Sequence, residues 1–192
     1  MNALITGFEP FGGDALNPAE LVLRSLPEQI GKYQVRRLLL PVVYQDAEQT
    51  LENNVTSDLD LILCLGQAGG SAALAFERVA VNLDECRSPD NAGDLRMGQP
   101  IDPNAPPAYF SALPVYDMAE AASRLNIPAR VSYSAGAYVC NHVMFTALRL
   151  AERIPGCRAG FIHMPYIPEQ GKQPSLPLDT IRAGILAAIE TL

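Results

Sequence analysis

The chain has 192 residues, of which 48% are hydrophobic and 18% are charged, and this balance indicates a folded globular protein. It carries 14 Lys and Arg against 21 Asp and Glu, which gives a formal net charge of −7, and it has no Lys/Arg-rich run. Nucleic acid and anionic membranes are therefore poor partners, and no apolar stretch reaches the roughly 18 residues that a membrane span needs.

Short apolar strands alternate with amphipathic helices along the chain. We expect strands at Ala3–Thr6, Tyr33–Leu40, Leu59–Leu65, Leu74–Asn82, Ala129–Ser132 and Arg158–His163. We expect helices from Asn17 to Leu26 and at Tyr44–Asn54, Val115–Leu125, Val139–Ile154 and Leu178–Leu192. Polar or Pro-rich loops are expected at Leu83–Pro107 and Met164–Pro177.

This alternation predicts one domain, residues 1–192, with a three-layer α/β/α sandwich around a mixed, largely parallel sheet. Functional sites in such folds gather where strands end. Three expected strands end in polar or glycine-rich features: at Gly66, just before Cys140, and at His163.

The N-terminus lacks the pattern of a signal peptide, so we expect a cytoplasmic protein whose four cysteines stay reduced. Only two histidines occur and no ligand cluster accompanies them, which argues against a metal site. The glycine-rich segment Gly66–Ser71 lacks the Gly-Lys-Ser/Thr ending of a phosphate loop.

The segment from Val131 to Phe145 reads as a strand, a tight turn and the start of a helix, with Cys140 at that start. Unpaired backbone N–H groups and the helix dipole favour a thiolate at such a position. The structural alternative, in which Cys140 is a small buried hydrophobe, is slightly favoured by this segment alone.

A catalytic cysteine needs a base. His142 lies two residues after Cys140 on the same helix, so the two side chains point about 200° apart. His163, at the end of a strand, is the better candidate. Glu77 stands in an otherwise apolar strand and could orient the imidazole, although a paired strand carboxylate beside Arg78 is the simpler interpretation of that residue alone.

Three segments together resemble the pyroglutamyl peptidase family of cysteine peptidases. They are the segment around Cys140-Asn141, the segment from GQAGG at Gly66 to Asn82, and Phe161–Tyr166. The opening Thr6–Gly13 with Asn17-Pro18, and Pro89–Gly93, match as well.

The resemblance implies a cofactor-free exopeptidase with a triad of Cys140, His163 and Glu77, which removes N-terminal pyroglutamyl residues through a thioester. It also implies a homo-oligomer, either a dimer or a tetramer. The backbone N–H of Cys140 and the side chain of Arg87 would stabilise the oxyanion. The residues implied in substrate binding are Phe8, Phe11, Asn17, Gln67 and Val139.

The chain departs from the family pattern at Ser71, at Ala75 and in an apparent insertion at Asp94–Gly98, and the segment after His163 looks shortened. Two alternatives therefore stay open. One is a cysteine amidase that acts on another lactam or small amide. The other is a non-catalytic module on a nucleoside-phosphorylase-like fold that binds a small molecule.

Overall fold

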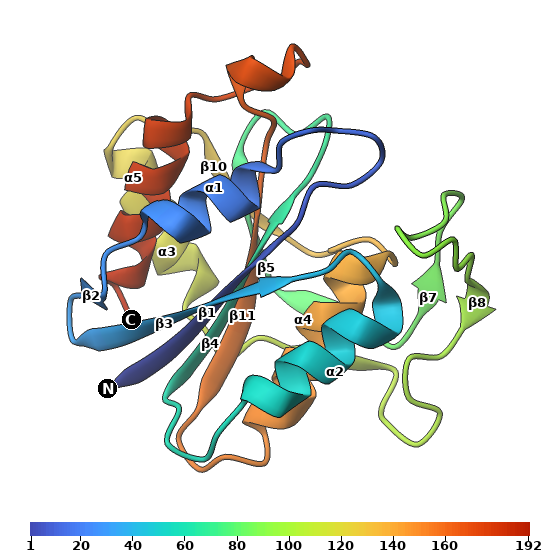
Figure 1. Ribbon diagram of the computed structural model, residues 1–192. Coiled ribbons are helices and arrows are strands. Elements are labelled where there is room, and N and C mark those ends of the chain that lie inside the picture. Colours follow the sequence, from blue (N-terminus) through green and yellow to red (C-terminus); the bar gives the residue numbers. More distant parts are fainter.

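The computed structural model describes residues 1–192 and shows strands and helices alternating along the chain (Figure 1). The strands are β1 (Asn2–Phe8), β2 (Gln29–Ile30), β3 (Tyr33–Leu40), β4 (Leu61–Gln67), β5 (Leu74–Glu77), β6 (Val79–Val81), β7 (Asp84–Glu85), β8 (Met97–Gln99), β9 (Ala108–Phe110), β10 (Ala129–Ser132) and β11 (Arg158–Met164). The helices are α1 (Pro18–Ser25), α2 (Tyr44–Asn54), α3 (Val115–Arg124), α4 (Val139–Ala151), α5 (Leu178–Ile189) and the short 3₁₀ helix η1 (Pro168–Gln170). None of these helices has the length and apolar character needed to cross a membrane.

The central sheet has seven strands in the order β10-β5-β11-β4-β1-β3-β2. Strands β3, β1, β4 and β11 run parallel to one another, whereas β5 pairs with β11 in the antiparallel sense. Strand β10 is parallel to β5, and the short β2 is antiparallel to β3. The prediction of a mixed, mostly parallel sheet is therefore confirmed.

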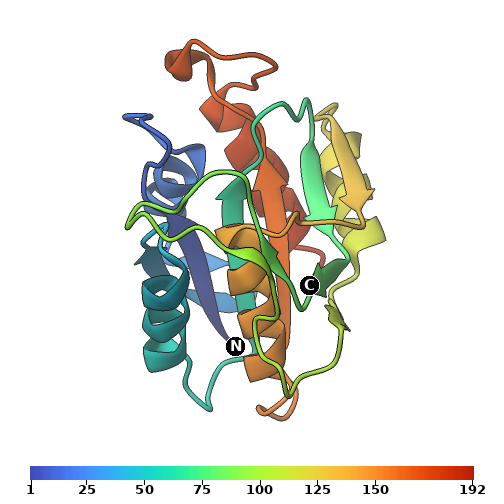
Figure 2. The same ribbon diagram turned by 90° about the vertical axis from the view of Figure 1, so that its right-hand side faces the viewer.

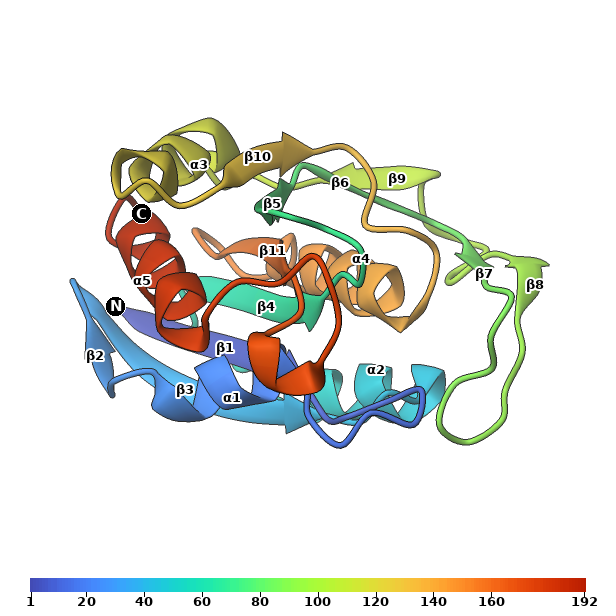
Figure 3. The same ribbon diagram turned by 90° about the horizontal axis from the view of Figure 1, so that it is seen from above.

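Helices cover both faces of the sheet. α1, α3 and α5 lie on one face, and α2 and α4 lie on the other (Figures 1 and 3). Alternate residues of β4 enter the two cores: Leu63 packs on the α1, α3 and α5 side, and Ile62 and Cys64 pack on the α2 and α4 side. Burial on both faces explains why β4 is a continuous apolar run in the sequence.

Two sequence predictions about the middle of the chain are wrong. The segment Leu74–Asn82 is not one strand, because the chain changes partner at Arg78: its N–H donates to the carbonyl of Ser132 in β10, whereas its carbonyl accepts the N–H of Ser111, just after β9. The strand β6 beyond it pairs with β9 instead. The expected loop Leu83–Pro107 contains the β7–β8 ribbon, and this green segment crosses in front of α4 in Figure 2.

The start of α1 was predicted correctly. Asn17 caps the helix: its Oδ1 accepts the N–H of Ala19 at 2.9 Å, and its Nδ2 donates to the carbonyl of Glu9 at 2.9 Å. Because Asn17 is buried, both bonds hold the loop after β1 against the end of the sheet.

Gly7 lets α1 approach β1, since a Cβ there would lie 2.7 Å from the carbonyl oxygen of Ala19. We expect Gly7→Ala to lower the free energy of unfolding by about 1–3 kcal/mol, because the backbone of α1 must shift to relieve the clash. Equilibrium urea denaturation measures the change, and Gly7→Val should lose more than Gly7→Ala. Equal stability of all three proteins would contradict this packing.

Candidate active site

Cys140 is the second residue of α4, and the start of this helix is uncapped. The N-cap residue Tyr138 makes no side-chain capping bond. The first helical N–H with an acceptor is that of His142, which donates to the carbonyl of Tyr138, so the N–H groups of Val139, Cys140 and Asn141 have none in the protein. Three free donors therefore surround the thiol, as the sequence predicted for this position.

The Cys140 thiol packs against the backbone of β4 at Gly66. A Cβ on Gly66 would lie 3.0 Å from Cys140 Sγ and 2.6 Å from Cζ of Phe161. No side chain fits in this space, so α4 can approach the sheet only because this position is glycine.

His163 and Glu77 come from neighbouring antiparallel strands. In the register of β11 and β5, Phe161 lies opposite Glu77 and His163 opposite Ala75. Both residues therefore project from the same face of the sheet, on the side of α4. His163 Nδ1 lies 2.9 Å from Glu77 Oε1, and both side chains are buried.

The environment of His163 favours the imidazolium. Burial lowers its pKa, but hydrogen bonding and charge interactions with Cys140 and Glu77 outweigh burial and raise the pKa of His163 to about 9. Because Nδ1 is bound to Glu77, Nε2 is the ring nitrogen that is left for the thiol. The structure thus brings together the three residues that the sequence suggested as nucleophile, base and orienting carboxylate.

The triad opens onto a cavity of about 340 Å³. All five residues that the resemblance implied in substrate binding line it: Phe8, Phe11, Asn17, Gln67 and Val139. The remaining lining residues are Val42, Ala68, Gly69, Ala75, Arg130, Ser134, Ala135, Gly136 and Tyr138. Nine of the 17 lining residues are hydrophobic, which suits an uncharged ring better than an ionised group.

Arg87 is not part of this cavity wall. It lies exposed on the segment after β7, without an ion pair or a side-chain hydrogen bond. Its implied role at the oxyanion stays a prediction.

Tyr138 is a cavity residue to which the sequence had given no role. Its ring centroid lies 6.4 Å from that of Phe11, and its hydroxyl donates to the carbonyl of Pro89. Burial, with a contribution from the Asp90 carboxylate, raises the pKa of Tyr138 to about 12, so the phenol is neutral. Its position directly before Val139 at the helix start was the signal that could have identified it.

His142 faces away from the triad, as the helical spacing predicted. Its Nδ1 lies 2.8 Å from Asp84 Oδ2 and its Nε2 lies 3.3 Å from Glu48. Arg96 binds Asp84, and Arg149 binds Glu48, at 2.7 and 2.9 Å. This network joins α4 to α2 and to the β7–β8 segment, so we assign His142 a structural role.

Comparison with known proteins gives a consistent result. A family model described as pyroglutamyl peptidase matches residues 1–192. A pyrrolidone-carboxylate peptidase of Levilactobacillus brevis is 46% identical over 198 residues, covering 100% of this chain and 97% of the relative. A relative with the same name from Streptococcus suis is 43% identical over 195 residues, covering 98% and 91%.

Solved structures agree with the sequence comparison. Pyroglutamyl peptidase I of Bacillus amyloliquefaciens aligns with a TM-score of 0.94 and 39% identity, covering 99% of this chain and 95% of that one. A mutant pyrrolidone carboxyl peptidase of Pyrococcus furiosus aligns with a TM-score of 0.94 and 40% identity, covering 99% and 97%. The family resemblance and the fold inferred from the sequence are both confirmed.

The network around His142 makes a prediction about stability. Burial opposes the charged ring, but hydrogen bonds to Asp84 and Glu48 outweigh it and raise the pKa of His142 in the folded state. Because the pKa of His142 is higher in the folded state, protonation of the ring stabilises the fold. This contribution is fully present below the pKa of the unfolded state, about 6.5, and it is lost as the pH rises through the pKa of the folded state.

We expect His142→Gln to lower the free energy of unfolding by about 2–3 kcal/mol at pH 6, and by less at higher pH. Urea denaturation of both proteins from pH 6 to pH 9 measures the difference. Arg124→Gln breaks an exposed ion pair with Glu120 and serves as a control that should change stability by less than about 0.5 kcal/mol. A destabilisation that is independent of pH would refute the charged state assigned to His142.

Proposed function

The chain belongs to the pyroglutamyl peptidase family, and we propose that it removes pyroglutamyl residues from the N-termini of peptides and proteins as a cysteine peptidase. The observation that carries the proposal is the convergence of Cys140, His163 and Glu77 on the wall of one cavity. A thiol beside an imidazole that a carboxylate orients is the arrangement used for attack on an amide carbonyl.

In the first half of the reaction the Cys140 thiolate attacks the carbonyl carbon of the scissile amide. The electron pair of the carbonyl moves to its oxygen, and a tetrahedral intermediate forms. His163, which holds its proton up to a pH of about 9, gives that proton to the leaving amine, so that the C–N bond breaks and a thioester remains. Glu77 stabilises the imidazolium before this transfer, and afterwards it holds the neutral imidazole in the tautomer with the proton on Nδ1.

In the second half of the reaction a water molecule attacks the thioester. The neutral His163 takes a proton from the water, the C–S bond breaks, and pyroglutamate leaves while Cys140 is regenerated as a thiolate paired with the imidazolium. Over both halves, the reaction consumes one water molecule for each amide bond that is cleaved, and no other reactant besides the substrate.

The developing oxyanion is stabilised by backbone groups at the start of α4. The N–H of Cys140 and its neighbours have no acceptor in the protein, so they are free to donate to the oxygen at no cost in broken bonds. A role for Arg87 requires a rearrangement of the segment after β7, because this side chain lies outside the cavity lining.

Recognition of the substrate rests on the apolar part of the pocket. A pyroglutamyl residue has no free α-amino charge, and its lactam ring offers one N–H and one carbonyl group. Phe8 and Phe11 supply apolar surface for the ring, and Asn17 holds the loop that carries Phe11. Backbone groups of Gln67 and Val139 hydrogen-bond the lactam in this proposal.

The wider setting of the enzyme is part of the same proposal. Four free cysteines support a reducing, cytoplasmic location. The aromatic side chains of Phe110, Tyr116 and Tyr133 are exposed, which supports assembly into a dimer or tetramer. Sedimentation velocity of the purified protein tests the assembly.

Hydrolysis of a pyroglutamyl amide tests the proposed activity. We expect Cys140→Ser to lose roughly 10⁴-fold or more in kcat, because the nucleophile is gone. Prolyl and glutaminyl amides should be poor substrates. A wild-type preference for either would instead support an amidase of different specificity.

Cys157→Ser is the matched control for the thiol. Burial raises the pKa of Cys157 to about 11, and this residue lies outside the cavity, so the variant should keep the wild-type rate and the wild-type sensitivity to alkylation. Full activity of Cys140→Ser, with the fold verified by circular dichroism, would refute the assignment of the nucleophile.

The pH dependence tests the roles of His163 and Glu77. Because the pKa of His163 is raised to about 9, kcat/KM should fall above that pH, where the leaving amine finds no proton donor. Glu77→Gln removes a charge that helps to raise this pKa, so the alkaline limb should move to lower pH and the rate should fall at least about 10²-fold.

The exposed Glu85 provides a control: Glu85→Gln makes the same chemical change outside the cavity and should leave the pH profile unchanged. An alkaline limb that stays in place in Glu77→Gln would show that Glu77 does not set the protonation of His163.

A further inference from the structure

Arg130 belongs to β10, the edge strand of the central sheet, and it stands in one row with the catalytic side of the cavity. Arg130 lies beside Ala75 of β5, and Ala75 lies beside His163 of β11. His163 lies in turn beside Gly66 of β4, the residue against which the Cys140 thiol packs. Residues paired across neighbouring strands project from the same face of a sheet, so this row lies on the α4 face.

The packing of β10 agrees with this direction of the Arg130 side chain. Its neighbours in the strand, Ala129 and Val131, pack against the core on the side of α1, α3 and α5. Because side chains alternate along a strand, Arg130 projects from the opposite face, and it lines the cavity.

The guanidinium of Arg130 has no partner in the protein. It is exposed, and it forms neither an ion pair nor a hydrogen bond. Arg130 is the only arginine or lysine of the cavity wall, and Glu77 is the only carboxylate. Glu77 is bound to His163, so the charge of Arg130 is free for an anion that enters the cavity.

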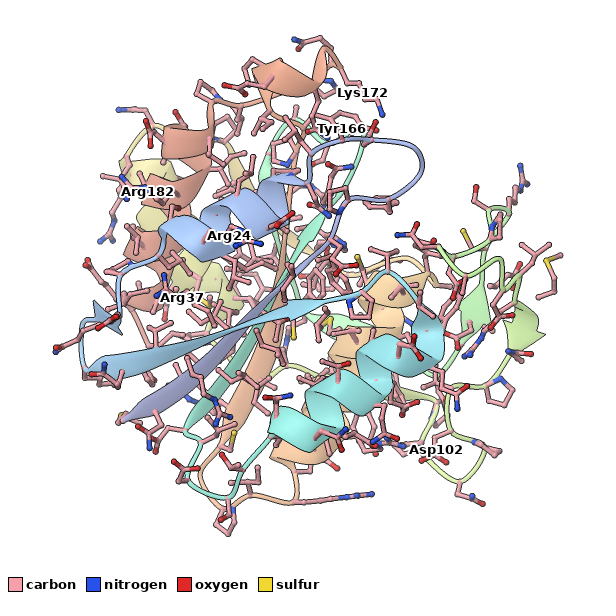
Figure 4. The ribbon with its side chains drawn as sticks, in the orientation of Figure 1. Arg24, Arg37, Asp102, Tyr166, Lys172 and Arg182 are labelled. Atoms are coloured by element: carbon pink, nitrogen blue, oxygen red, sulfur yellow. The ribbon has the colours of Figure 1, made fainter.

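Lys172 is a cation beside the β4 end of the cavity, but its charge is already paired. Figure 4 shows Lys172 and Tyr166 next to the loop that follows β1. The hydroxyl of Tyr166 covers Gly69 of the cavity wall so closely that no Cβ fits there. Lys172 Nζ lies 2.7 Å from Asp14 Oδ2. A carboxylate in the cavity therefore finds an unpaired cation only at the Arg130 end.

The row across the sheet also indicates which half of a substrate meets Arg130. In the proposed reaction His163 gives its proton to the leaving amine, so this amine lies on the His163 side of the Cys140 thiol. The leaving peptide then continues over Ala75, whose methyl group leaves room for it, toward Arg130. Phe8 lies on β1, on the other side of β4, where the acyl half of the substrate is held.

The spacing of the strands limits the reach of Arg130 to the beginning of the leaving peptide. Two strand spacings, about 10 Å, separate the Cα atoms of His163 and Arg130. An extended peptide covers about 3.3–3.6 Å of this span with each residue, and the long arginine stem covers the rest.

We propose that Arg130 is a specificity-determining residue that binds a carboxylate on the first residue of the leaving peptide. This inference rests on the proposed function. The carboxylate is either an acidic side chain or the free C-terminus of a dipeptide substrate, since the guanidinium binds both in the same geometry.

Two matched pairs of pyroglutamyl dipeptides test the proposal and distinguish these two sources. Pyroglutamyl-glutamate α-amide is compared with its neutral isostere, pyroglutamyl-glutamine α-amide, and pyroglutamyl-alanine with pyroglutamyl-alanine amide. All four form the same thioester, so differences in kcat/KM arise from the leaving half. We expect the wild-type protein to prefer the carboxylate in at least one pair by about 3-fold to 10-fold at low ionic strength, and that pair identifies the source.

Substitution of Arg130 should remove this preference. In Arg130→Gln the ratio of kcat/KM within the preferred pair should fall to about 1, and Arg130→Glu should prefer the neutral member. Both substrates of a pair are assayed on one protein sample, so the ratio is independent of the fraction that is folded. Arg153→Gln makes the same charge change at an exposed arginine outside the cavity and without an ion pair, and it should keep the wild-type ratio.

Equal kcat/KM within both pairs of the wild-type protein, or a preference that survives in Arg130→Gln, would overturn the proposal. An equal fall on all four substrates, with a shift of the alkaline limb, would also overturn it and would assign Arg130 to the unpartnered Oε2 of Glu77. A wild-type protein that hydrolyses none of the four substrates refutes the proposed function itself, whereas an active protein without the preference refutes only the role of Arg130.

Discussion

The buried pair of His163 and Glu77 is the interaction on which the site depends. Glu77 is 1% exposed, and its Oε2 has no partner in the protein, so the carboxylate gives up most of its hydration. That loss is offset only by a charged partner, and the imidazolium of His163 supplies it at 2.9 Å. The antiparallel pairing of β5 with β11 brings Glu77 and His163 together. The reversed direction of β5 in the sheet is therefore what creates this ion pair.

The regular elements could be predicted because their burial leaves an apolar pattern in the sequence. Features that arise from pairing between distant segments could not be predicted in this way. β4 and α4 carry strong apolar signals because both are packed on the sheet core, and their positions agree with the sequence. The break at Arg78 leaves no such signal, since its cause is hydrogen bonding to Ser132 and Ser111, which are distant in the chain. The β7–β8 ribbon is polar and exposed on most of its residues, so its sequence resembles that of a loop.

The same distinction holds for the site. The position of Cys140 at a helix start and the opposite direction of His142 follow from local spacing, and the structure agrees with both. The choice of Glu77 over the other carboxylates came from the family resemblance, because residue patterns alone favoured a simple strand pair.

Adjacent residues at the start of α4 contact two different parts of the protein. Cys140 faces Gly66 and the cavity, whereas Asn141 bonds to the backbone of Val81 and Leu83, and His142 binds Asp84. These bonds attach the segment between β6 and β7 to the turn of α4 that carries Cys140, the proposed nucleophile. Arg96 extends this attachment by binding Asp84. The segment Asp94–Gly98, where we expect an insertion relative to the family, is thus linked to α4 through Arg96, Asp84 and His142.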